Sequence, residues 1–249
     1  MKIVKYKKEA NSKYKVFLED GSTLSFYEEV LLKFNLLIQK EIDQQTLIEA
    51  DSYNQECDVY YAALNSIKSR LKSTYELKMW LLKKEYSTDL VDKAIEKLTE
   101  QGYLSDENYA KSYLNYQLIT TNKGPYRIAR ELEEKKIDSS VIAEEIQNFS
   151  EEEQKIRIKK IIEKGIEKNH TRGGVVLKQK IVNDLKGLGY DFSLIQELIS
   201  TYSFSNDKDL AKKEYEKLLK KYSRKYQGEE LKRKIEQQLY RKGLCYEQE

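Results

Sequence analysis

The architecture of this chain can be derived from residues 86–137, which read YSTDLVDKAIEKLTEQGYLSDENYAKSYLNYQLITTNKGPYRIARELEEKKI. Gly102 follows a run with helical spacing and is placed to end that helix. Ser105 or Asp106 can cap the next helix, because their side-chain oxygens accept from free backbone N–H groups. Pro125, the only proline, suits the first turn of a further helix, where its missing N–H costs nothing. This stretch therefore predicts helices joined by short turns.

The same apolar spacing recurs along the chain. The first copy is Leu77, Leu81, Tyr86 and Leu90, followed by Ile128, Leu132, Ile137 and Val141, then by Ile181, Leu185, Tyr190 and Leu194, and then by Ile235, Leu239 and Leu244. A period of about 50 residues with one supersecondary unit per copy is typical of repeat arrays, in which each unit buries its face on its neighbour. We therefore expect a mainly α protein, built from tandem three-helix (helix-turn-helix-like) repeats that form an elongated, curved array.

The turns between the helices repeat as well. Ser87, Asp138 and Asp191 stand at equivalent positions, and each is a candidate N-cap of a third helix. After the first triplet, Tyr103 and Leu104 are expected to anchor the turn in the core.

The N-terminal segment has a different pattern. Residues 1–26 contain three short alternating runs separated by turn residues, which predicts a small antiparallel β-sheet. A helix is expected to begin near Glu28 and a second near Asp43. The expected domains are a sheet and helix module at 1–57, three-helix repeats at 58–104, 105–150 and 151–204, and a partial repeat of two helices at 205–249.

Composition and cysteine usage narrow the class of protein. Charged residues make up 35% of the 249 and hydrophobic ones 39%, which suits helices that each bury one stripe. No apolar run approaches a membrane span, and the first residues lack the pattern of a secretory signal. Cys57 and Cys245 are far apart and lie in no C-x-x-C motif, so we expect no disulfide framework and a cytoplasmic location.

Sequence signatures of catalysis are weak. Neither a G-x-x-x-x-G-K-[ST] nor a G-x-G-x-x-G motif occurs, and His170 is the only histidine, so no histidine pair can hold zinc. His170 lies beside Thr171, Arg172 and two glycines, which indicates an exposed loop rather than a general base. Runs of glutamate are typical of a solvated helix face. We expect a binding protein without enzymatic activity, metal or cofactor.

Two motifs carry a resemblance to a known family. Residues 102–110 read GYLSDENYA, residues 124–132 read GPYRIAREL, and Lys136-Ile137 follows. This arrangement resembles the signature of the RecX family of modulators of the RecA recombinase, and the match is strongest over about residues 58–150. Lys136 departs from the family pattern, in which glycine often precedes the apolar residue, and this departure bears on the geometry of the helix end.

The resemblance implies a modulator that binds within the groove of the RecA–single-stranded DNA filament and dampens the recombinase without catalysis or cofactor. The implied partners are the RecA filament and single-stranded DNA, contacted directly or through RecA, and a monomeric chain is expected. The resemblance assigns no particular binding residues.

We therefore choose candidate binding residues from the distribution of basic side chains. Residues 155–186 carry ten basic side chains and three acidic ones. The candidates are Lys123, Arg127, Arg130 and Lys135 in the second triplet and Lys155, Arg157, Lys160, Lys164, Lys168, Arg172 and Lys178 in the third. Lys160, Lys164 and Lys168 are spaced i, i+4, i+8, so one helical face is basic. This density of like charge favours a polyanion or an acidic partner.

Two other functions remain open from the sequence. The triplets could act as helix-turn-helix units that read duplex DNA, although no second helix carries a cluster of Arg, Asn and Gln suited to base edges. A scaffold for protein partners alone would show no dependence on nucleic acid.

Overall fold

The predicted N-terminal sheet is present in the computed structural model, which describes residues 1–204 and 208–246. Strands β1 (Ile3–Lys8), β2 (Lys13–Leu18) and β3 (Thr23–Tyr27) pair antiparallel in the order β1-β2-β3. One face packs on the helices that follow, through a cluster that includes Val16 and Phe26. This packing stabilises a sheet that would be marginal alone.

The helix expected from Glu28 is broken. It forms α1 (Glu28–Lys33) and α2 (Leu36–Gln39), because Asn35 adopts a left-handed conformation with φ 52°. The second expected helix, α3 (Gln44–Ser69), is capped by Asp43, which accepts from the Thr46 N–H at 2.8 Å. The domain boundary placed between residues 57 and 58 falls inside α3. The first half of α3 packs on the sheet, and its second half packs on the helices of the first triplet.

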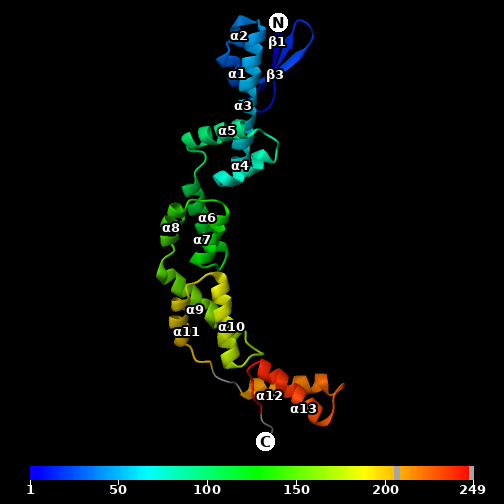
Figure 1. The fold of residues 1–249 in the computed structure, drawn as a ribbon, viewed down its shortest axis with the longest axis vertical. Helices are drawn as coiled ribbons and strands as arrows, with labels where there is room; N and C mark the ends of the chain where they lie inside the picture. Colours follow the sequence, from blue (N-terminus) through cyan, green and yellow to red (C-terminus); the bar gives the residue numbers. More distant parts are fainter. Residues whose placement is uncertain (205–207, 247–249) are drawn as a thin grey trace. The chain divides into compact units, whose positions relative to one another are not determined.

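The remaining described residues are mainly helical, as expected (Figure 1). The helices are α4 (Thr74–Leu82), α5 (Thr88–Glu100), α6 (Asp106–Thr120), α7 (Pro125–Glu134), α8 (Ser139–Gln147), α9 (Glu151–Glu167), α10 (Gly174–Leu188), α11 (Phe192–Ser200), α12 (Lys208–Tyr222) and α13 (Gly228–Arg241). The predicted start and end of the last helix pair, at residues 205 and 249, lie outside the described residues. The chain divides into two compact units, one of residues 1–110 with 135–138 and the other of the remainder.

The repeating apolar positions are the core of each triplet. The first two positions of every copy are buried, which confirms the predicted periodicity: Leu77 and Leu81, Ile128 and Leu132, Ile181 and Leu185, and Ile235 and Leu239. They lie on the second helix of each copy, α4, α7, α10 and α13.

The end of each second helix has the same backbone conformation. The residues with positive φ are Glu85 (66°), Lys136 (58°), Gly189 (88°) and Gly243 (68°). Lys136 therefore keeps the left-handed conformation for which glycine is better suited, so its departure from the family pattern changes the residue and not the turn.

The carbonyl just before this turn joins successive triplets. The Lys135 carbonyl accepts from Ser73 Oγ at 3.2 Å, and the Leu188 carbonyl accepts from the Gly124 N–H at 2.7 Å. The Lys242 carbonyl accepts from the Gly173 N–H, also at 2.7 Å. In each case a carbonyl at the end of a second helix accepts a hydrogen bond from a donor at the start of the second helix of the preceding triplet.

Two turn residues differ from expectation. Leu104 is buried, but Tyr103 is 60% exposed, so the expectation that Tyr103 anchors the turn is wrong. Ser87 stands at the N-cap of α5 without a side-chain cap hydrogen bond, whereas Asp191 caps α11 as expected. Ser105 accepts from the Asn108 N–H and so caps α6.

Candidate functional site

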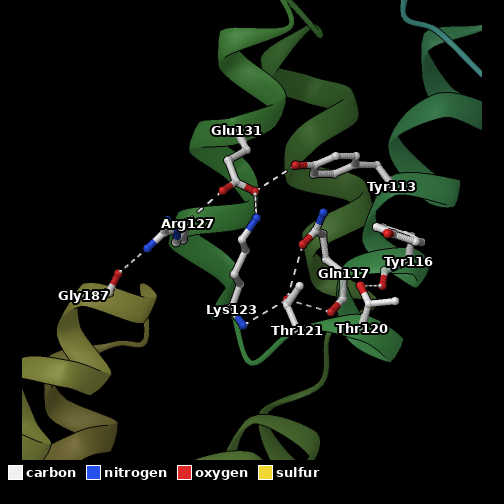
Figure 2. A network of polar contacts seen from close by, with 9 residues as sticks. All are labelled: Tyr113, Tyr116, Gln117, Thr120, Thr121, Lys123, Arg127, Glu131 and Gly187. Atoms are coloured by element: carbon white, nitrogen blue, oxygen red, sulfur yellow. Dashed lines mark hydrogen bonds and ion pairs between the residues drawn. The ribbon is translucent and has the colours of Figure 1, made fainter.

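Two of the four candidates in the second triplet, Lys123 and Arg127, contact one carboxylate (Figure 2). Glu131 accepts hydrogen bonds from Lys123 Nζ at 2.7 Å, from the Tyr113 hydroxyl at 2.8 Å and from Arg127 Nε at 3.4 Å. Desolvation raises the pKa of the Glu131 carboxyl, but the bonds from Lys123 and Tyr113 outweigh it and hold this pKa below its usual value. Lys123 and Arg127 thus neutralise an acid of their own triplet.

Arg127 also binds the neighbouring triplet. Its Nη1 donates to the Gly187 carbonyl at 3.1 Å, near the end of α10 (Figure 2). Gly124 and Gly189 allow this close approach, because a Cβ on Gly189 would lie 2.4 Å from the Arg127 backbone nitrogen. Arg127 is therefore part of the joint between α7 and α10.

The other two candidates of the second triplet also face carboxylates. Lys135 donates to Glu76 Oε1 at 2.5 Å, and Arg130 approaches Glu134 at 3.9 Å with 80% of its side chain exposed. Burial raises the pKa of the Glu76 carboxyl, and the hydrogen bond from Lys135 more than offsets this effect. The Arg130 pair is the weaker of the two, because it is long and open to solvent.

The first turn of α9 resembles the second triplet. Lys155 pairs with Glu151 at 2.7 Å. Arg157 is only 18% exposed and pairs with Glu153 at 2.9 Å. The guanidinium also donates to the carbonyls of Leu118 at 2.5 Å and Thr121 at 3.1 Å, at the end of α6. Arg157 thus holds α9 against α6.

The remaining five candidates have no acidic partner among the described residues. They are Lys160, Lys164, Lys168, Arg172 and Lys178. Lys164, Lys168 and Arg172 line a groove of about 330 Å³ between α9 and α10, and Lys160 lies one turn earlier on the same face of α9. Lys180 also lines the groove, paired with Asp184, and the sequence-based candidates did not include it. Lys178 lies on α10 outside this lining.

Small and polar residues shape the groove. Gly165 lets α10 approach α9, because a Cβ there would lie 2.9 Å from Ile181 Cδ1. The Asn169 side chain donates to the Arg172 carbonyl at 2.7 Å and accepts from the Arg172 N–H at 3.0 Å, which fixes the loop that carries this arginine. Ile161 and Leu177 are apolar residues of the groove lining.

This arrangement can bind anions. Of the four cations that line the groove, only Lys180 pairs with an acid among the described residues, and that acid is Asp184. The other three can attract phosphate or carboxylate groups, and Arg172 can bind either in a bidentate manner. His170 is exposed in the bend beside it. Within the described residues, His, Cys, Asp and Glu form no cluster suited to a metal ion, and no helix is both long and apolar enough to cross a membrane.

Comparisons with known proteins identify the three-helix units. The model of the first three-helix domain of RecX matches residues 60–98, and that of the second matches residues 105–145. Regulatory protein RecX of Bacillus subtilis is 32% identical over 242 residues, covering 95% of this chain and 91% of the relative. Regulatory protein RecX of Lactococcus lactis is 30% identical, covering 92% and 87%.

Solved structures share the fold. A crystal structure of regulatory protein RecX aligns with a TM-score of 0.70 at 23% identity, covering 80% of this chain and 98% of that one. The crystal structure of RecX from Lactobacillus salivarius aligns with a TM-score of 0.57 at 24% identity, covering 60% and 97%.

Proposed function

This chain belongs to the RecX family of regulatory proteins, and we propose that it binds the RecA–single-stranded DNA filament and lowers the ATPase, strand-exchange and coprotease activities of RecA. The observation that carries this proposal is the groove between α9 and α10. Three cations that line it have no acidic partner in the part of the chain that the structure describes, while neighbouring basic residues are neutralised within the fold. The filament carries a regular array of negative charge, which can pair with these cations.

The chemistry of the groove fits contacts with a polyanion. Unpaired cations at this density repel one another, and this repulsion is relieved when phosphates or carboxylates bind and displace counterions. Lys160, Lys164 and Lys168 follow one face of α9, so they can contact successive charges along an extended partner. Such contacts explain binding without any catalytic group.

The test is the ATPase rate of RecA on single-stranded DNA, titrated with the wild-type chain and with the variant K160E/K164E/K168E. The matched control is K68E/K83E/K111E, which makes the same change of charge at exposed lysines outside the groove. We expect a dose-dependent fall in ATPase with the wild type and the control. K160E/K164E/K168E should need at least about tenfold more protein for the same fall in ATPase rate, because three attractive contacts become repulsive.

Two outcomes would overturn the proposal. Equal inhibition by K160E/K164E/K168E and by the control would exclude the groove as the contact surface. No effect of the wild type at any concentration would exclude RecA as the target, and a footprint on duplex DNA without RecA would then favour a helix-turn-helix reader of duplex DNA.

A further inference from the structure

Part of the second face of the N-terminal sheet lies outside the main hydrophobic cluster. The strand register places Lys5, Phe17 and Thr23 in one row across β1, β2 and β3. Lys7, Lys15 and Ser25 form the next row. Alternation along the strands directs both rows away from the buried Val16 and Phe26. The part of this face near Tyr27 is covered by α3, because Tyr27 stacks on Tyr61 of that helix.

The lysines of these rows differ from the other lysines of the same strands. Lys8 lies 3.8 Å from Glu28 and Lys13 lies 2.9 Å from Asp58, so both have acidic partners. Lys5, Lys7 and Lys15 have none among the described residues, and the two rows contain no acid. Lys7 and Lys15 are direct cross-strand neighbours, and like charges in that position destabilise a sheet. An anion bound on this face would remove that cost.

Phe17 lies within this charged surface. It is partly exposed, is not part of the hydrophobic cluster that includes Val16 and Phe26, and has Lys5 directly opposite on β1. The Lys15 ammonium lies 5.7 Å from the centre of the Phe17 ring. An aromatic ring on the central strand with cations around it offers a stacking surface beside a charged one.

We propose that this face of the sheet binds single-stranded nucleic acid, with the phosphates at Lys5, Lys7 and Lys15 and one base stacked on Phe17. Base stacking on a partly exposed aromatic ring requires a base whose face is free, which duplex DNA does not offer. An acidic protein would satisfy the lysines but gives Phe17 no comparable partner. The surface is separate from the α9–α10 groove, and its function does not depend on RecA.

The experiment measures binding of the full chain to a fluorescent oligo-dT by anisotropy, without RecA. Every variant is made in the K160E/K164E/K168E background, which reverses the charge of the basic face of α9. We expect the parent to bind and K5Q/K7Q/K15Q to bind at least about tenfold more weakly. For K5Q/K7Q/K15Q, the slope of log affinity against log salt concentration should be shallower by about 2. Three phosphate contacts are lost, and each contributes about 0.7 on a single strand.

Matched variants separate charge from stacking and from folding. K7Q should weaken binding more than K8Q, because Lys8 lies on the next position of β1 and is paired with Glu28. F17L should bind oligo-dT about tenfold more weakly and an abasic oligonucleotide as the parent does, since the lost contact is with a base. F17Y keeps the aromatic ring and should bind normally.

Several results would overturn this inference. The first is absence of oligo-dT binding by the parent, and the second is unchanged binding by K5Q/K7Q/K15Q. The third is an F17L variant whose affinity falls as much for the abasic oligonucleotide as for oligo-dT. Competition by polyglutamate as strong as that by oligo-dT would indicate an acidic protein instead. A uridine oligomer tested in parallel shows whether the surface distinguishes RNA from DNA, and tight binding of either supports the proposal.

Discussion

The second and third triplets carry similar basic residues, but the fold uses them in different ways. Lys123 and Arg127 neutralise Glu131, and Lys135 neutralises Glu76. Arg127 also joins α7 to α10. Lys164 on α9 and Lys168 at its C-cap line a groove and have no acidic partners among the described residues. A positive charge therefore indicates a binding surface only where the fold provides no acid to meet it.

The source of the acids explains this difference. Glu131 lies on the same helix as Arg127, and Glu76 comes from the preceding triplet. In α9 the acids are concentrated in the first turn, where they pair with Lys155 and Arg157. Further along, Glu163 accepts from the Tyr202 hydroxyl and pairs with no lysine within the described ranges 1–204 and 208–246.

The largest effect that we expect concerns the joint between these triplets. Gly189→Ala should lower the free energy of unfolding by about 3 to 4 kcal/mol, because alanine is strained at this positive φ and its Cβ would clash with Arg127. Lys136→Gly, at the equivalent turn, should raise it by about 0.5 to 1 kcal/mol. Urea unfolding measures both, and two changes of the same sign would contradict the equivalence of the turns.

Arg157→Met tests whether a cation near the groove is structural. We expect a loss of about 2 to 3 kcal/mol in urea unfolding, because the Leu118 and Thr121 carbonyls lose a charged donor and Glu153 loses its partner. Lys164→Gln is the matched control on α9 and should stay within about 0.5 kcal/mol of the wild type. Equal effects of the two substitutions would remove the distinction between structural and available cations.

Glu131→Gln tests the acid of the second triplet through pH. Because the pKa of Glu131 is lowered in the folded state, its stabilisation is complete above its ordinary value of 4.5 and is lost as the pH falls through the lower, folded value. We expect the variant to be less stable by about 1 to 2 kcal/mol at pH 7. This difference should shrink below pH 4.5 in unfolding curves measured across pH. A difference that is independent of pH would show that the charge of Glu131 is not responsible.

The sequence predicts the repeats because burial follows a spacing that can be counted, as Ile128 and Ile181 show. The break at Asn35 was not predicted, because left-handed backbone at a non-glycine residue depends on tertiary packing. The candidate site was only partly predictable. The regular spacing of Lys164 and Lys168 gave the basic face, but the contact between Lys135 and Glu76 joins residues far apart in the sequence. The part played by Gly165 in shaping the groove could not be derived from spacing either.

The most direct test compares the two sets of cations on the RecA–single-stranded DNA filament itself. Binding is measured across a salt titration for the wild type, for the groove variant K164Q/K168Q/R172Q and for the second-triplet variant K123Q/R127Q/R130Q, each confirmed to be folded. We expect the groove variant to bind at least about tenfold more weakly with a shallower salt dependence, and the second-triplet variant to bind within about twofold of the wild type. Weaker binding by the second-triplet variant, with normal binding by the groove variant, would contradict the account.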